Sequence, residues 1–218
     1  IKKKLPLLQT SIALGLIVAI DLGSVGGRYL DENAYQAFKP KDQAQPQTAA
    51  DRVILNDGDP SLRVLNLSVS PFNDATTSFC HQSIGGYHGA KMKRYQEFVE
   101  NRINADLNLM QIGMRGAKTI FDAQKAFTGC AGLNMLNTKY IIIDSKSSPI
   151  ENPYHYGAAW FPRNIEYVKG PDQEMEAVKT AYNLKDVVFV DERFKSSIKS
   201  WKGNYDSTAT VEVEVYSP

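Results

Sequence analysis

Residues 165–190, IEYVKGPDQEMEAVKTAYNLKDVVFV, hold the pattern that decides the fold class. The segment from Ile165 to Val168 is typical of a strand. Gly170-Pro171-Asp172 then predicts a helix start, because proline and acidic residues suit the first helical turn, and Asn183 ends that helix. The unbroken apolar run 187–190 predicts a strand buried on both faces. Strand, helix and strand in this order indicate a crossover unit.

Segments before this unit indicate the same fold class. Residues 63–69, RVLNLSV, alternate well enough for a strand, and residues 140–144 predict a second strong one. Between these two strands we expect a helix over about 90–104, an uncertain helical region over 118–127 and a short helix near 133–136. The prediction is therefore helices packed on a mixed sheet, in an α/β or α+β arrangement.

The end of the sequence has a different character. Residues 208–216, TATVEVEVY, place three valines on one face and two glutamates on the other, which predicts a half-buried strand. No partner strand is evident after it. We expect this strand to cover the domain's own core or to pair across a homodimer.

An apolar run near the beginning concerns the membrane. Leu5 to Ile20 follows three lysines and precedes Asp21, and counting to Leu22 gives 18 residues, near the lower limit of roughly 17–25 for a span. The positive-inside rule would put the lysines in the cytoplasm and the rest of the chain outside. A buried core helix is the alternative. A cleaved signal peptide fits less well, because residues 19–21 make a poor cleavage site.

These patterns divide the chain into four parts. We expect a membrane-spanning or anchor helix over 1–22, an extended strap with Pro40 and Pro46 over 23–50, an extracytoplasmic α/β domain over 51–200 and a separate final segment over 201–218.

Composition limits the function classes. The 218 residues are 43% apolar, which suffices for one sizeable core. Lysine and arginine together number 25 against 24 acidic residues, so no overall field attracts nucleic acid or an anionic surface. Any anion recognition must be local.

The main candidate site is residues 85–98, GGYHGAKMKRYQEF, where a glycine-rich loop runs into a basic amphipathic helix. One hypothesis is that the helix start, with its free N–H groups, combines with Lys91 and Arg94 to hold a phosphate or an acidic sugar. The alternative is that the loop only caps and packs the helix while both cations are solvated. The candidate ligand-binding residues are Asn73, Asp74, Tyr87, His88, Lys91, Arg94, Tyr95 and Trp160.

Other chemistries have weaker signals. Asp57 and Asp59 form a D-x-D that could hold a metal, although DGDP is also an ordinary turn composition. No histidine spacing favours a zinc site, no nucleophile motif is present, and neither a cofactor nor a catalytic residue is expected. Cys80 and Cys130 are the only cysteines, and they could form a disulfide outside the cell or stay two buried thiols.

Four stretches together resemble the YfhO family of multi-pass bacterial membrane proteins. They are FNDATTSFCHQSIGGYHGAKMKRYQEF at 72–98, DLGSVGGRYL at 21–30, LNMLNTKYIIID at 133–144 and GAAWF at 157–161. Members of that family resemble GT-C glycosyltransferases, which transfer sugars from polyprenyl-phosphate carriers outside the cytoplasmic membrane. Nothing here matches the catalytic acid of that class.

The resemblance implies an exterior, non-catalytic domain of an envelope glycosyltransferase in the bacterial cytoplasmic membrane. It also implies that residues 201–218 are the start of a β-rich module. Its partners would be the remaining transmembrane part of the same protein and a glycan or polyprenyl-phosphate sugar. The alternative is a non-catalytic envelope domain that binds a glycan, a lipid headgroup or a partner protein. A self-contained hydrolase is the weakest interpretation, since the sequence shows no nucleophile motif or paired carboxylates.

Overall fold

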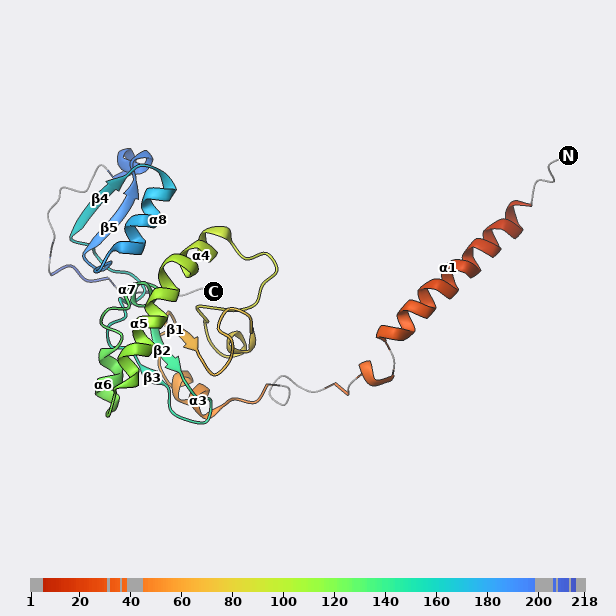
Figure 1. Ribbon diagram of the computed structural model, residues 1–218, viewed down its shortest axis with the longest axis horizontal. Helices are drawn as coiled ribbons and strands as arrows, with labels where there is room; N and C mark the ends of the chain where they lie inside the picture. The colour runs from red at the N-terminus through yellow and green to blue at the C-terminus, as the bar shows by residue number, and fades with distance from the viewer. Residues whose placement is uncertain are drawn as a thin grey trace. The chain divides into compact units, whose positions relative to one another are not determined.

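The computed structural model describes residues 6–30, 32–35, 37–38, 45–198, 206, 208–211 and 213–214. It separates into two compact units, residues 1–44 and residues 45–218 (Figure 1).

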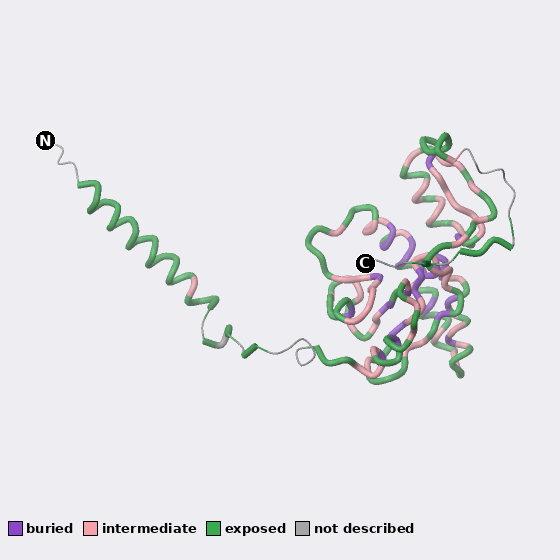
Figure 2. The backbone as a smooth tube through the Cα atoms, turned by 180° about the vertical axis from the view of Figure 1, so that it is seen from behind, coloured by how far each residue is buried: buried purple, intermediate pink, exposed green. Residues whose placement is uncertain are grey.

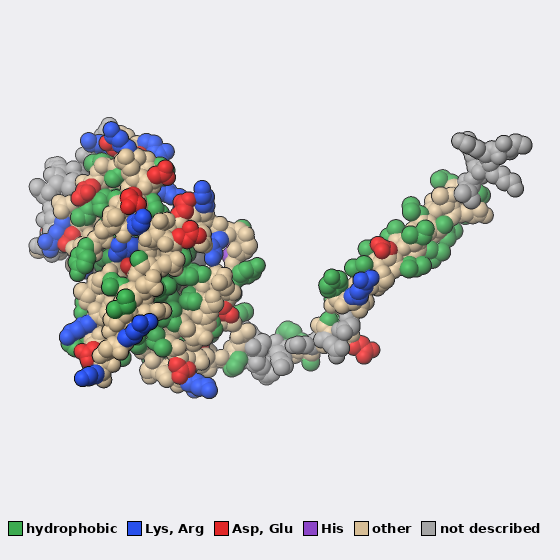
Figure 3. Space-filling view, viewed as in Figure 1, with side chains coloured by type: hydrophobic (Ala, Val, Ile, Leu, Met, Phe, Trp, Pro, Cys, Tyr) green, Lys and Arg blue, Asp and Glu red, His purple; other side chains and the backbone are tan. Residues whose placement is uncertain are grey.

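The first unit is dominated by α1, a helix of 23 residues from Leu7 to Tyr29. None of its described residues is buried, and its surface is mainly apolar (Figure 3). It is long and apolar enough to cross a membrane, a property that signal sequences share. The expected helix end at Leu22 is wrong, because the helix continues through Gly23, Gly26 and Gly27. A helical glycine costs only about 1 kcal/mol relative to alanine, so a short glycine cluster need not end a helix. A short 3₁₀ turn follows at Glu32–Ala34.

The second unit is built around a mixed three-stranded sheet in the order β1, β2, β3. The strands are β1 (Arg63–Asn66), β2 (Thr138–Ile142) and β3 (Ile150–Glu151). β1 and β2 are parallel, with Leu65 opposite Ile141, and β3 is antiparallel to β2. The mixed sheet predicted from the sequence is confirmed.

Most of the chain between β1 and β2 is helical. The predicted helix over 90–104 begins at Lys93 and continues to Arg115, with a wider π-helical turn at Val99–Ile103 in its middle. The uncertain region 118–127 contains a helix whose start is fixed by a capping box of Thr119 and Asp122. The helical segments of this part are α3 (Ala49–Leu55), which precedes β1, η2 (Thr76–Phe79), α4 (Lys93–Phe98), η3 (Val99–Ile103), α5 (Asn104–Arg115), α6 (Ile120–Lys125) and α7 (Ala131–Met135).

Both faces of this sheet are covered. Leu65 and Ile141 belong to a core cluster with buried residues of the long helix, including Ile103 and Met110. Successive strand residues point to opposite faces, and Val64 accordingly packs in a second cluster with α3. Buried positions concentrate at these two contacts (Figure 2). The sequence alternation therefore predicts which strand residue faces which helix layer.

The predicted crossover unit is confirmed as β4 (Asn164–Val168), α8 (Gly170–Thr180) and β5 (Val187–Asp191). β4 and β5 are parallel and form a separate two-stranded sheet against which α8 packs (Figure 1). The expectation that residues 187–190 are buried on both faces is wrong, since all four stay partly exposed. A two-stranded sheet with one covering helix leaves the other face open. A 3₁₀ segment, η4 (Glu192–Ile198), follows β5.

The strand expected over 208–216 is not formed in the part of it that the structure describes, residues 208–211 and 213–214. Val211 and Val213 are nearly half exposed, at 47% and 45%. The remaining residues of that segment lie outside the described ones. Pairing across a homodimer stays a prediction.

Candidate functional site

The glycine-rich loop before α4 is folded tightly onto residues 71 and 72. The N–H of Gly86 donates to the carbonyl of Pro71 at 2.8 Å, and Gly86 has a φ of 124°, which favours glycine. The hydroxyl of Tyr95, on α4, donates to the carbonyl of Ile84. The loop and the helix start therefore form one packed unit, as the sequence suggested.

The predicted anion site relies on a central pair, Lys91 and Arg94, that the structure does not place on one helical face. Met92 is extended, so α4 starts at Lys93 and Lys91 lies before the helix, not on a common face with Arg94. The Nζ of Lys91 donates to the carbonyl of Phe72 at 3.3 Å and lies 5.9 Å from the centre of the Phe72 ring. Arg94 has a 79% exposed side chain and pairs with Glu174 on α8 at 3.3 Å. Lys91 therefore contacts the loop at Phe72, and Arg94 contacts α8.

Four of the predicted residues do meet in one hollow of about 380 Å³, here called the aromatic hollow. Tyr87, at 70% exposure, and Tyr95 line it together with Phe72. Two nitrogen-bearing side chains, His88 and Lys91, also line it. Ring faces beside a few polar groups suit a small ligand with apolar and polar sides.

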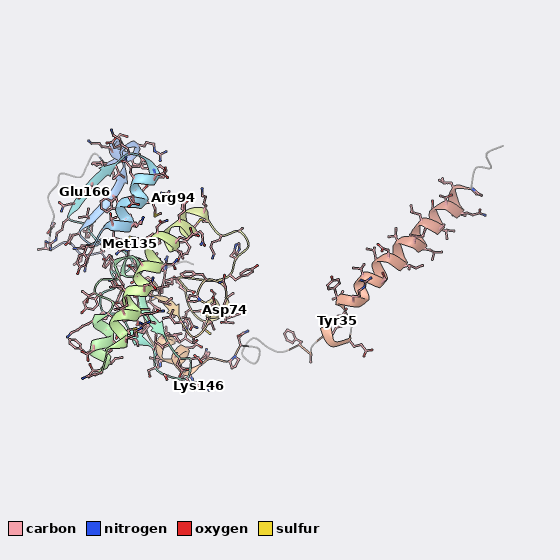
Figure 4. The ribbon with its side chains drawn as sticks, in the orientation of Figure 1. Tyr35, Asp74, Arg94, Met135, Lys146 and Glu166 are labelled. Carbon is pink, nitrogen blue, oxygen red and sulfur yellow. The ribbon has the colours of Figure 1, made fainter. Side chains whose placement is uncertain are left out.

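The other predicted residues lie outside this hollow. Asp74 accepts from the N–H and hydroxyl of Thr76 within its own turn. Arg94 belongs to α4, at some distance along the chain from that turn (Figure 4). Asn73 donates to the Ser70 hydroxyl at 3.3 Å. The Trp160 ring packs edge-on against Tyr156, with 5.1 Å between the ring centres. The loop residues are therefore used in local turns, and Trp160 packs against another ring.

The disulfide considered for Cys80 and Cys130 is not formed. Cys130 is fully buried and its thiol donates to the carbonyls of Asp106 and Ala126, at 3.4 and 3.3 Å. Burial, together with the nearby Asp106 charge, raises the pKa of the Cys130 thiol to about 12. A thiol in this state is a poor nucleophile.

The D-x-D of the sequence belongs to a turn, as its composition suggested. Asp57 accepts from the Nζ of Lys139 at 2.6 Å and from the hydroxyl of Tyr140 at 2.8 Å. Asp59 accepts from the N–H and hydroxyl of Ser61. Among the described residues, no three histidine, cysteine or acidic side chains are grouped to hold a metal.

A second pocket, of about 680 Å³, lies where the parallel strands β1 and β2 end, and is here called the strand-end pocket. Asn66 is the last residue of β1, and Asp144 follows β2 by two residues. In open α/β sheets, ligands bind outside the carboxyl ends of the strands. The polar residues Asn66 and Asp144, which follow two predicted strands, could have indicated this pocket from the sequence, but the sequence analysis did not predict a site there. The pocket's lining includes Asp51, Asn66, Ser68, Thr77, Phe79 and Asp144.

One wall of the strand-end pocket is held by a pair that the sequence did not predict. The carboxylate of Asp51 accepts from the N–H and hydroxyl of Thr48 at 2.8 and 2.7 Å. Its other oxygen is 2.8 Å from the Nε2 of His81, whose side chain is 2% exposed. Burial by itself would raise the pKa of Asp51, but the hydrogen bonds from Thr48 and His81 outweigh it and lower the pKa below 3.8. An ionised carboxylate only accepts hydrogen bonds, so the His81 nitrogen is the donor.

The lowered pKa of Asp51 gives a testable pH dependence. A carboxyl with a lower pKa in the folded than in the unfolded chain stabilises the fold above the unfolded pKa, and this contribution is lost as the pH falls through the folded pKa. We therefore expect the stability difference between the unchanged protein and Asp51→Asn to shrink when the pH falls from about 6 to about 3. Urea unfolding at the two pH values measures it. A difference that stays constant would contradict the interpretation.

Comparisons with known proteins add nothing to this picture. No family model matches the chain, no curated protein is similar enough to count as a relative, and no solved structure matches its fold.

Proposed function

We propose that the chain is an extracytoplasmic domain of a YfhO-like membrane protein of the bacterial cytoplasmic membrane. In this proposal it is a non-catalytic, accessory part of an envelope glycosyltransferase that uses a polyprenyl-phosphate sugar. The resemblance carried by residues 72–98 and three further stretches motivates the family and the sugar chemistry.

The exposed apolar surface of α1 is the observation that supports a location in the membrane. Its most apolar 18-residue window has a mean hydropathy of 1.7 and no buried residue. Leaving that much apolar surface in water costs roughly 25 cal/mol per Å². A bilayer would remove this cost, and a helix of 23 residues at 1.5 Å per residue suffices to cross its core. The lysines at positions 2–4 favour the cytoplasmic side for the beginning of the chain.

The two pockets support a binding role over a catalytic one. Three side chains that could act in acid–base or nucleophilic chemistry are tied to structural partners: Asp57 to Lys139, Asp106 to Arg102, and the Cys130 thiol to two carbonyls. The aromatic hollow and the strand-end pocket still present ring faces, hydroxyls and an amide. This observation also favours the second candidate function, an envelope domain that binds a glycan, a lipid headgroup or a partner protein.

A cysteine-labelling experiment tests the topology. Tyr35 is 70% exposed and follows α1, so in a Cys80→Ala background Tyr35→Cys offers one accessible thiol. The native Cys130 is fully buried with a raised pKa and should stay unlabelled. We expect Tyr35→Cys to react with a membrane-impermeant maleimide in intact bacterial cells.

Two controls complete the test. Lys3→Cys should react only after the cells are permeabilised, and the protein should remain in the membrane fraction after a carbonate wash. Mass spectrometry of the recovered chain should still detect α1, which distinguishes an anchor from a cleaved signal sequence. Labelling of Tyr35→Cys only in permeabilised cells, or loss of α1, would count against the proposal.

A further inference from the structure

The helices α5 and α6 form a hairpin with apolar side chains on its outer surface. The two helices lie side by side (Figure 1), and a Cβ added at Gly113 of α5 would lie only 2.7 Å from the Cβ of Ala126, just after α6. Residues 109–125 are here called the hairpin tip. Large apolar side chains stay exposed on it, namely Leu109 (46%), Ile112 (66%), Ile120 (62%) and Phe121 (60%).

A different set of residues attaches the hairpin to the domain. Met110 of α5 is fully buried in the core cluster, and Ala123 is the buried residue of α6. The hairpin is therefore held in place without burial of the exposed apolar side chains. Exposed apolar residues that gather on one part of a surface mark an interaction site.

Basic residues accompany these apolar side chains. The hairpin tip contains Arg115, Lys118 and Lys125 against one acidic residue, Asp122, whereas the whole chain is almost balanced, with 25 basic and 24 acidic residues. All three basic residues are exposed. The Nζ of Lys125 lies 4.5 Å from the centre of the Phe121 ring, so a cation and an apolar ring are exposed side by side. The hairpin tip thus combines an apolar surface with a local excess of positive charge.

This combination fits the surface of a bilayer that contains anionic lipids. Aliphatic and aromatic side chains enter the boundary between headgroups and acyl chains, while the long side chains of lysine and arginine reach the phosphates. A second copy docked through the same surface would bring like charges together, which is unfavourable. A bilayer that holds α1 would also be present at a high local concentration, because only residues 30–44 separate α1 from the second unit.

We propose that the hairpin tip docks on the surface of an anionic phospholipid bilayer. The exposed apolar side chains enter the interface, and the three basic side chains contact lipid phosphates. This docking rests on the proposed function, in which α1 anchors the chain in a membrane. It adds a second contact with that membrane, made by the folded domain and dependent on lipid charge.

Fluorescence quenching on the full chain tests the docking. In a Cys80→Ala background, Ile120→Cys carries an NBD label at the hairpin tip. Tyr182→Cys, 80% exposed and outside the hairpin, carries the same label as a control. The chain is reconstituted in vesicles of phosphatidylcholine, with or without phosphatidylglycerol, that include a nitroxide-labelled lipid. We expect quenching at position 120 only with phosphatidylglycerol and at low salt, and none at position 182.

A charge variant tests the role of the basic residues. Lys118→Gln/Lys125→Gln should lower the ratio of docked to undocked domain about tenfold, because each cation near an anionic surface strengthens binding. Lys146→Gln/Lys169→Gln removes the same charge from exposed positions outside the hairpin and should leave the ratio unchanged. Equal quenching in the two double variants would overturn the role of charge and with it the docking.

An apolar variant tests the insertion. Ile112→Ser/Phe121→Ser should also lower the ratio about tenfold, because two apolar side chains no longer enter the interface. Phe161→Ser/Phe194→Ser removes rings that are 50% and 54% exposed outside the hairpin, and it should have no effect. The melting temperatures of both variants should stay close to that of the unchanged protein, because the substituted side chains are exposed.

Flotation of the vesicles separates failure of the docking from failure of the anchor. A chain without a membrane anchor would not float with pure phosphatidylcholine vesicles, and quenching at position 120 by phosphatidylglycerol vesicles would then still support the docking. A chain that floats while position 120 stays unquenched in anionic vesicles overturns it. An NBD label that is equally shielded from water in detergent and in every lipid also overturns it, because another part of the chain or a second protein would then cover the hairpin tip.

Discussion

Asp106→Ala is expected to lower the free energy of unfolding by about 3–5 kcal/mol, because it leaves a buried arginine without its counter-charge. The Nε of Arg102 lies 3.2 Å from Asp106 Oδ1, and the two side chains are only 8% and 3% exposed. The second carboxylate oxygen, Oδ2, accepts from the N–H of Leu133 at 3.0 Å. The substitution therefore also removes the partner of a buried N–H at the start of α7.

The same arginine ties the crossover unit to the long helix. Its Nη1 donates to the carbonyls of Lys179 and Ala181 at 3.1 and 2.8 Å, at the end of α8. Loss of Asp106 should thus loosen the attachment of α8 as well as that of α7. Hydrogen exchange of both helices should show this loosening.

Urea unfolding followed by tryptophan fluorescence measures the effect. Glu176→Ala is a matched control, since Glu176 pairs with Lys179 at 3.2 Å while both side chains are about half exposed. An exposed pair contributes only about 0–1 kcal/mol. A loss below about 1 kcal/mol for Asp106→Ala would show that the buried pair does not hold these elements together.

Gly85→Ala should destabilise the domain by about 1–3 kcal/mol, because the position has no room for a side chain. An added Cβ would lie 1.8 Å from the carbonyl oxygen of Pro71, the same oxygen that accepts from the N–H of Gly86 at 2.8 Å. Because this oxygen belongs to the backbone, it cannot rotate away from the added Cβ as the end of a flexible side chain could. The loop would have to separate from residue 71, which breaks this hydrogen bond and reshapes the aromatic hollow.

Gly89→Ala in the same loop is the control for Gly85→Ala. A Cβ at Gly89 would meet nothing within 4 Å, and the substitution also reduces the freedom of the unfolded chain. It should leave the melting temperature equal or slightly higher. Equal melting temperatures for the two variants would mean that the close contact at Pro71 is not needed.

Local patterns predicted the elements that depend on local interactions. The strand, helix and strand over 164–191 and the strand β2 follow from apolar runs, proline and turn residues. The long helix was predicted to start about three residues too early. The N–H of Ala90 donates to the ring Nδ1 of His88, and Lys91 is held by the carbonyl of Phe72, so contacts with the loop delay the helix.

The strand-end pocket could not be predicted in the same way, because its wall is formed by residues that lie far apart in the sequence. Asp51 and His81 are 30 residues apart and meet only because α3 and the segment after η2 both pack at the end of β1 and β2. The burial of residues 187–190 likewise depends on how many strands join their sheet, which an apolar run does not encode. The separation of Lys91 from Arg94 follows from a helix start shifted by a few residues.

The π-helical turn at Val99–Ile103 gives the long helix one residue more than a regular α-helical turn would hold. Phe98 and Ile103 are five residues apart and both belong to the core cluster, and the wider turn brings residues at this spacing toward one face. Deleting one residue within the turn would restore ordinary α-helical hydrogen bonding. Because the wider turn holds one residue more than an α-helical turn, the residues after it, including Asp106 and Met110, would keep their present faces. The surplus residue is therefore absorbed within one turn, and the helix can lose it without turning its second half away from α7 and the core.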